Sequence, residues 1–387
     1  MNAARARRRG GFSVVELMVS VVIGLLALMF ATRLVANSEK TKQASLGGSD
    51  AMQNGMVALF SVSNDAAQAG WGLNDPLISG CNTVFSDTAG FALAGATRGG
   101  VAVTPLAGAV IVSNGLDPDQ LSLYSGTSMS GTGTLRVISY AGGNSIDVDR
   151  GSYGFALNDV ILVAPETLGN NCALAQIAQD PAGNPQLRID AGAGQRFNTG
   201  ALGAPFDAYK ARLFNLGPAA ALSFHTWSVR NGFLQLRATD LAGASQAGAT
   251  VIDNVVSLKA QYGFDTRVGA AFTPTSGPLV AQWSGGMIDA DGDGVVGGAA
   301  DYQHVVALRI AVVARSKNPD KPGADGSCSS TAVAPTVFSA AQPFGVTAVP
   351  VTVNVAVAGD PVSWKCYRYR VFETIVPLRN AGWRPTA

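Results

Sequence analysis

The chain has 387 residues, a formal net charge of +1, and 47% hydrophobic against 14% charged residues. This length and apolar content allow one large or two ordinary domains with a substantial core. The low charge argues against intrinsic disorder and against a nucleic-acid-binding surface. Only two histidines are present and no cysteines form a CxxC pair, which argues against a histidine-based metal centre, a zinc site and a thioredoxin-like site.

The N-terminus joins a basic segment to a long apolar run. Four arginines lie among the first nine residues, and the apolar run extends from Phe12 to Thr32. As a helix this run is about 31 Å long, enough to cross a bilayer core of about 30 Å. The arginines predict a cytoplasmic N-terminus and an exported remainder. A secretory signal peptide is the alternative, but the run is long and the LVANS segment that follows is a poor cleavage site.

One acid, Glu16, lies inside this apolar run. An ionisable group at that depth costs roughly 2–3 kcal/mol and indicates a function. The segment GFSVVE at residues 11–16 resembles the class III signal of type IV pilins. The resemblance implies that a prepilin peptidase cuts between Gly11 and Phe12, that Phe12 is N-methylated, and that residues 1–11 are a leader peptide. It also implies an assembly role for Glu16, because a buried carboxylate needs a positive partner and the freed amine of a neighbouring subunit supplies one.

From Asn37 to about Gly70 the sequence is polar but keeps a helical period. We expect residues 12–33 to form the transmembrane half of one long helix and residues 34–70 its amphipathic half, ending at Ala69-Gly70. The pair Gly47-Gly48 predicts a kink or a short unwound stretch, since each glycine costs about 1 kcal/mol in a helix. The apolar stripe expected to lie against a globular head consists of Met52, Met56, Phe60 and Ala67, with Leu59 and Ser63 beside it.

Beyond Trp71 the pattern is that of β-strands. The sequence predicts an α+β fold, in which the long N-terminal helix packs on a large, mainly antiparallel β head over residues 71–387. The head is either one unit or two lobes joined near residues 185–205, where Gly, Pro and Asn accumulate. Strands are expected at 109–113, 120–126, 159–165, 304–316 and 367–380, hairpins at 135–150 and around Asn231-Gly232, and a long strand or a short helix and strand from Val251.

Three later segments resemble the PilW family of type IV pilus-assembly proteins, which are minor pilins. They are VVSLKAQYGFDT at 255–266, DYQHVVALRIAVVARS at 301–316 and YRYRVFETIVPLRN at 367–380. The resemblance implies an inner-membrane, single-pass protein with a periplasmic head that later reaches the filament tip. It implies roles in pilus assembly, twitching motility and cell adhesion. The implied partners are other minor pilins, the major pilin, a tip-associated adhesin, the prepilin peptidase and the inner-membrane assembly platform.

The segment DADGDGVV at residues 289–296 matches the first half of a calcium-binding EF-hand loop. The glutamate expected at the twelfth position is missing, and Asp301, one residue later, is the expected substitute. Calcium binding with modest affinity is one interpretation, and a solvated acidic turn is the other. The expected Ca²⁺ ligands are the side chains of Asp289, Asp291, Asp293 and Asp301 and the carbonyl of Val295.

The four cysteines are expected to form two disulfides, because an exported head lies in an oxidising compartment. Three pairings are possible. We prefer the sequential one, which closes the shorter loops, and similar pilins often link their C-terminal region in this way. The pairs would be Cys81–Cys172 and Cys328–Cys366.

No catalytic motif is apparent, and we expect no enzymatic activity. The chain lacks G-x-S-x-G, Walker A and HExxH sequences. His225 is expected to be a packed or surface histidine on a strand, and His304 to lie at the start of a strand without a metal role. The remaining alternatives are a type II secretion pseudopilin, an adhesin that binds a surface or carbohydrate directly, and a membrane-tethered enzyme. Loss of secretion with intact piliation on deletion would favour the first, and surface binding by an isolated head the second.

Overall fold

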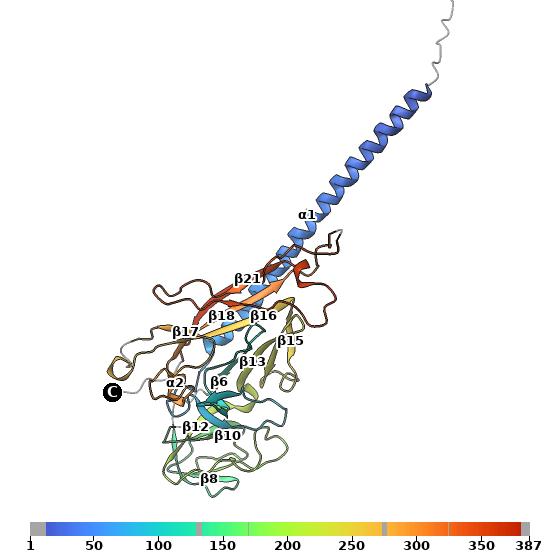
Figure 1. The fold of residues 1–387 in the computed structure, drawn as a ribbon. Coiled ribbons are helices and arrows are strands. Elements are labelled where there is room, and N and C mark those ends of the chain that lie inside the picture. The colour runs from blue at the N-terminus through green and yellow to red at the C-terminus, as the bar shows by residue number, and fades with distance from the viewer. Residues whose placement is uncertain (1–12, 129–133, 169, 273–276, 324, 381–387) are drawn as a thin grey trace, which may run out of the picture.

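The computed structural model describes residues 13–128, 134–168, 170–272, 277–323 and 325–380. One helix of 55 residues, α1 (Val14–Gln68), projects from a β-rich head and lies against it only over its last part (Figure 1). The helix ends where expected, because Ala69 leaves the helical conformation and Gly70 has a positive φ of 85°. The α+β fold with a long N-terminal helix and a mainly antiparallel head is confirmed.

The head contains three main sheets. The four-stranded sheet has the order β17-β16-β18-β21, and all its pairs are antiparallel. Its strands are β17 (Gln282–Ser284), β16 (Val255–Phe264), β18 (Val305–Arg315) and β21 (Tyr369–Pro377). The five-stranded sheet consists, in order, of β15 (Ala249–Asp253), β14 (Phe233–Ala238), β13 (Ser223–Arg230), β6 (Gln120–Ser125) and β5 (Ala109–Val112).

The third sheet has eight strands and lies farthest from the helix (Figure 1). Its β1 and β10 pair in parallel, whereas its other pairs are antiparallel. In order, it consists of β11 (Gln186–Arg188), β8 (Ser145–Val148), β7 (Leu135–Ser139), β12 (Ala211–Pro218), β9 (Asp159–Pro165), β10 (Cys172–Gln176), β1 (Cys81–Val84) and β4 (Pro105–Leu106).

Short elements fill the connections. There are two small hairpins, one of β2 (Ala96–Arg98) with β3 (Val101–Val103) and one of β19 (Thr336–Val337) with β20 (Val351–Thr352). The short helices are α2 (Ala299–Gln303) and the 3₁₀ turns η1 (Ala219–Ala221), η2 (Gly269–Ala271) and η4 (Trp364–Cys366). Asn231 and Gly232 form the expected tight turn between β13 and β14, with φ values of 53° and 80° that suit a type I′ hairpin.

The cores show how the layers are stacked. One core joins the last part of α1, through Ala58 and Val62, to Leu234 of the five-stranded sheet and to Leu258 and Leu308 of the four-stranded sheet. Thus α1 and the five-stranded sheet share one face of the four-stranded sheet. A second core lies between the five-stranded and eight-stranded sheets. The continuous apolar run of β18 follows from this arrangement, since that strand is covered on both faces.

Two expectations from the sequence need correction. The helix runs through Gly47 and Gly48 without interruption, because Gly47 is buried against Ser316 and the head supports the backbone there. Residues 185–205 are no linker, since Leu187 and Phe197 are buried in the cores beside the eight-stranded sheet. Of the two alternatives from Val251, the structure shows the extended one, as the strands β15 and β16 with no helix between them.

Candidate assembly site on the stalk helix

The membrane half of α1, which we define as Val14–Val35, makes no contact with the head. A candidate membrane span covers Val14–Glu39, and none of its most apolar window is buried. Glu16 lies in the first turn of the helix and is exposed, and it is the only acid of this half. Gly11 and Phe12, the predicted cleavage and methylation residues, lie outside the described residues. This helix is long and apolar enough to cross a membrane, and its whole circumference is available to neighbours.

The head half of α1, residues 47–68, is held by small residues. The helix buries a stripe at spacings of three and four, which consists of Gly47, Ala51, Gly55, Ala58, Val62 and Ala66. The larger apolar residues expected to face the head point away from it, and that expectation was wrong. Met52, Met56 and Phe60 are 52%, 48% and 71% exposed. Ala67 is exposed as well. We call Met52, Met56, Val57 and Phe60 the exposed ridge.

The small residues allow the helix to approach the sheet closely. A β-carbon on Gly55 would lie 2.1 Å from the ring of Phe372 on β21, so no larger residue fits there without displacing that ring. Large side chains on this stripe would hold the helix away from β18 and β21. The small residues face the head, and the large apolar residues face away, because the space between helix and sheet admits only small side chains.

A polar clamp fixes the flank of the head half to the five-stranded sheet. The Nδ1 atom of His225 lies 2.7 Å from Asp65 Oδ2 on the helix, and its Nε2 atom lies 2.8 Å from Asp240 Oδ1. Trp227 Nε1 donates to the same Asp65 oxygen at 2.7 Å. Burial of the ring favours its neutral form, but the hydrogen bonds to Asp240 and Asp65 outweigh burial and raise the pKa of His225 to about 9.

His225 also affects the ionisation of Asp240. Burial opposes ionisation of Asp240, yet the hydrogen bond from His225 holds its pKa below the usual value. The imidazolium thus links two carboxylates, one on the helix and one on the sheet. The sequence indicated a strand around His225 but not the partners of its side chain, because Asp65 lies 160 residues away along the chain and no local pattern marks the pair.

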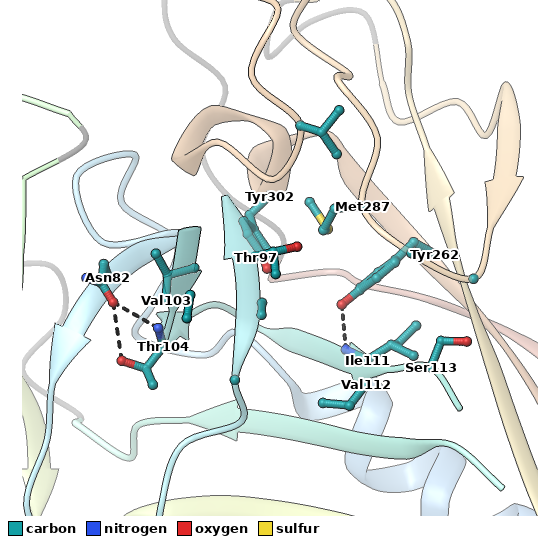
Figure 2. Close-up of a pocket in the computed structure, with 16 residues that line it drawn as sticks. Asn82, Thr97, Val103, Thr104, Ile111, Val112, Ser113, Tyr262, Met287 and Tyr302 are labelled. Carbon is teal, nitrogen blue, oxygen red and sulfur yellow. Dashed lines mark hydrogen bonds between the residues drawn. The ribbon is translucent and has the colours of Figure 1, made fainter. Parts of the chain in front are cut away.

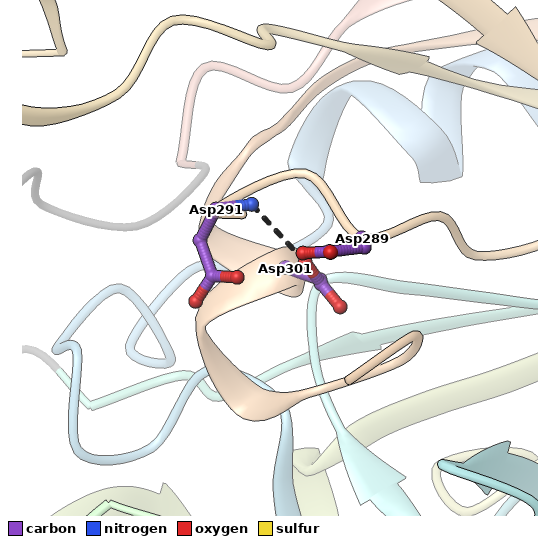
Figure 3. Close-up of side chains that lie close together, drawn as sticks. All are labelled: Asp289, Asp291 and Asp301. Atoms are coloured by element: carbon purple, nitrogen blue, oxygen red, sulfur yellow. Dashed lines mark hydrogen bonds between the residues drawn. The ribbon is translucent and has the colours of Figure 1, made fainter. Parts of the chain in front are cut away.

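The acidic loop after β17 brings three carboxylates together (Figure 3). Oxygens of Asp289, Asp291 and Asp301 lie within 4.8 Å of one another. Asp301 stands in the first turn of α2, and this turn of helix returns it to the loop, where its Oδ1 accepts from the amides of Ala290 and Asp291. Burial raises the pKa of Asp301, and burial together with the neighbouring acids raises that of Asp291. A divalent cation would relieve this repulsion.

The other two expected ligands lie beside this trio. The Oδ1 atom of Asp293 accepts from the amide of Val295 at 2.7 Å, and the Val295 carbonyl accepts from the amide of Gly298 at 3.2 Å. His304, three residues after Asp301, does not belong to this cluster of carboxylates. It is buried, its ring stacks on Phe272 at 3.8 Å, and its Nδ1 atom bonds to the Asp265 carbonyl. Its role in the described structure is packing.

A cavity of about 710 Å³ opens between the β2–β3 hairpin and the end of β5 (Figure 2). Its described lining residues are uncharged, and include Val103, Ile111 and Met287. The Tyr262 hydroxyl accepts from the amide of Ile111, whereas that of Tyr302 is buried with no partner among the described residues. Among the described lining residues, no nucleophilic side chain lies beside a base.

The cysteines form the two preferred disulfides, Cys81–Cys172 and Cys328–Cys366. The first links the parallel strands β1 and β10 of the eight-stranded sheet. The second joins the long connection after β18 to η4, directly before β21.

Comparison with known proteins identifies one region. Residues 227–380 match the family model of PilW, described as Type IV Pilus-assembly protein W. This range contains β14 to β21, the acidic loop and the Cys328–Cys366 disulfide. Among solved structures, a type IV-like pilin from Thermus thermophilus is similar, with 11% identity and a TM-score of 0.18 over 58% of this chain and 87% of that one. No curated protein sequence matches the chain.

Proposed function

Because residues 227–380 match the family of type IV pilus-assembly protein W, we propose that this type IV pilus-related protein is a minor pilin. In this proposal it joins or primes the filament tip through α1. Its role is assembly and not catalysis. The peptidase cleaves after Gly11, Phe12 becomes the methylated N-terminus, and Glu16 pairs with the free amine of an adjacent subunit.

The exposed state of α1 supports this proposal most directly. The membrane half is bare on all sides, and after a polar stretch at residues 37–50 the exposed ridge presents further apolar side chains on the head half. A helix that served only as an anchor would have no need for an apolar outer face beyond the membrane. Helices of neighbouring subunits would cover both surfaces at once, with a gain of about 25 cal/mol for each Å² of apolar area buried.

In this proposal the location of the protein changes when the precursor is processed and assembled. The precursor spans the inner membrane once, with its head in the periplasm, and the mature subunit moves to the pilus tip. Its proposed partners are other minor pilins, the major pilin, a tip-associated adhesin, the prepilin peptidase and the inner-membrane assembly platform.

We also propose that the acidic loop binds Ca²⁺ as a structural clamp. Asp289, Asp291 and Asp301 supply the convergent carboxylates. The loop connects distant parts of the head, since the guanidinium of Arg98 at the end of β2 donates to the Gly297 carbonyl at 3.2 Å and the amide of Gly99 donates to the Val296 carbonyl at 3.0 Å. Calcium would rigidify this junction.

The function is tested on the mature N-terminus. The full chain is expressed with the other pilus proteins of its host, and the membrane and sheared-pilus fractions are analysed by N-terminal mass spectrometry. We expect N-methylated Phe12 as the first residue in both fractions. Gly11→Leu is the matched variant, and it should leave the unprocessed precursor in the membrane.

Two outcomes would contradict the proposal. A mature protein that began near Asn37 and was released from the membrane would show a signal peptide. A deletion that abolished secretion but left the number of pili unchanged would identify a pseudopilin.

A further inference from the structure

The last strand of the head has one unpaired edge. β21 pairs with β18 on one side and is the final strand of the four-stranded sheet. It is nine residues long, and several of its residues are exposed, including Arg370, Val371 and Glu373. An edge strand of this length presents a row of free backbone groups to any extended chain that approaches it.

The hydrogen bonds at the two ends of the ladder show which groups are free. The amide of Ser316 donates to the Arg368 carbonyl at 2.8 Å, and that of Leu378 donates to the Val306 carbonyl at 2.9 Å. In an antiparallel ladder, opposite residues alternate between hydrogen-bonded and non-hydrogen-bonded pairs. The backbone groups of the even-numbered residues of β21 therefore bond to β18. The odd-numbered residues direct their N–H and C=O groups outward. These outward groups belong to Tyr369, Val371, Glu373 and Ile375, and no other strand of the described chain pairs with them.

The stalk helix borders this edge. Asn54 and Asp65 bond to Asp253 and His225 of the five-stranded sheet, which fixes one flank of the helix. At 100° per residue, Met52 and Met56 fall on the opposite flank, toward the outside of β21. Both are about half exposed. A strand added to β21 would therefore lie beside the apolar side chains of Met52 and Met56.

The helix and the strand run in the same direction. Gly47 approaches Ser316, which pairs with Arg368, Gly55 approaches Phe372, and the side chain of Asn380 donates to the Gln68 carbonyl. If two copies formed a symmetric dimer through this edge, the twofold axis would make their two β21 strands antiparallel. Their stalk helices would then point in opposite directions and could not share one membrane. The geometry excludes a second β21 as the occupant.

We propose that the outer edge of β21 accepts a non-equivalent β-strand from the head of a neighbouring helix-anchored subunit. The strand adds main-chain hydrogen bonds to the odd-numbered residues and packs an apolar side chain against Met52 and Met56. This inference rests on the proposed function, because it needs a neighbour with a helix in the same membrane. It adds a second contact, on the head, to the helix contacts of α1.

Amide hydrogen exchange with single-residue resolution tests the pairing. The full chain is measured alone in detergent and again in the complex purified after co-expression with the other subunits of the same pilus. Alone, the amides of Val371, Glu373 and Ile375 should exchange fast and those of Phe372 and Thr374 slowly. In the complex the odd-numbered amides should slow by at least about tenfold.

A matched pair of variants tests whether the free amide matters. Val371→Pro removes an outward N–H while the even-numbered ladder to β18 stays intact, and proline is accepted at edge positions. Val371→Thr keeps both the N–H and the branched shape. We expect Val371→Pro to lower recovery of the chain in the complex by about tenfold, the equivalent of 1.4 kcal/mol, and Val371→Thr to leave recovery unchanged.

The outcomes separate the two proposals. If the wild-type chain joins no complex, the proposed function fails and this inference with it. If the complex forms while the odd-numbered amides stay fast, or if Val371→Pro assembles normally, only the strand pairing is overturned. If Val371→Pro does not fold, as judged by melting and by its disulfides, the exchange pattern of the wild type decides alone.

Discussion

Glu16 is the residue on which the assembly proposal depends most. It is the single acid of the bare membrane half of α1, four residues from the proposed new N-terminus at Phe12. An unpaired carboxylate is costly at membrane depth, and an amine from a neighbour would remove that cost. The side chain therefore favours the assembled state over the free subunit.

Glu16→Gln keeps the size of the side chain and removes its charge. Processing to Phe12 should continue, because the peptidase recognises the residues at the cut. Incorporation should fall by about tenfold or more, since a charge-assisted hydrogen bond contributes about 1.5–3 kcal/mol. The amount of mature protein in sheared pili, normalised to the membrane fraction, measures this effect. Normal incorporation of the variant would contradict the pairing.

His225 makes the contact between helix and head sensitive to pH. Its pKa is about 9 in the folded protein and about 6.5 in an unfolded chain. A raised pKa contributes stability that is fully present below about pH 6.5 and is lost as the pH rises through 9. The unfolding free energy of the wild type should fall by up to about 3 kcal/mol over this window.

Denaturant unfolding at several pH values checks this prediction. His225→Gln retains hydrogen-bonding capacity without a titrating charge, and its stability should be nearly independent of pH in the same window. Equal pH slopes for the variant and the wild type would show that the clamp does not control the helix contact.

At the level of elements, α1 shows why an apolar stripe does not by itself identify a buried face. Met52, Met56 and Phe60 form a regular stripe, yet the head covers the small residues on the other side. Helix and sheet approach most closely where side chains are smallest, and Gly55 permits contact with Phe372. The larger apolar residues then remain available for other subunits.

Gly55→Ala tests the close approach. The new methyl group would meet the Phe372 ring, and the strain should lower the unfolding free energy by about 1–3 kcal/mol. Gly48→Ala is the matched control on the same helix, because a β-carbon there has open space. It should leave stability unchanged or raise it by about 1 kcal/mol. Thermal melting of both variants measures these changes. If Gly55→Ala were as stable as the wild type, helix and sheet would be less tightly packed than the structure shows.

At the level of the whole molecule, the head is three sheets joined by a few cross-links. The Cys81–Cys172 disulfide lies within the eight-stranded sheet, and Cys328–Cys366 fastens the connection that leads into β21. The acidic loop leads from β17 into α2 and meets the β2–β3 hairpin. Binding of a cation at this junction would stabilise the head as one unit.

Calcium should raise the melting temperature of the full chain. At a concentration of 100 times Kd the added stability is about 2.7 kcal/mol. Asp291→Asn removes one of the three convergent charges and should abolish most of the shift. Asp207→Asn, at an exposed acid far from the loop, is the control and should keep it. An identical melting temperature of the wild type with calcium and with a chelator would remove the site.

By itself the sequence determined the elements and the chemistry that depends on neighbours along the chain. The apolar run with Glu16, the strands at 109–113 and 304–316, the turn at Asn231-Gly232 and the alternating acids are local patterns, because helix period, strand alternation and loop spacing act over a few residues. Segments 255–266, 301–316 and 367–380 were also enough to indicate the family that residues 227–380 match.

Only the tertiary structure decided which surfaces are covered. It turned the small residues of α1 toward the sheet, brought Asp65 and Asp240 to His225, returned Asp301 to the acidic loop, and left β21 as an edge. Each depends on contacts between residues far apart in the chain. The sequence lists the candidates for such contacts, but the space between packed elements selects among them.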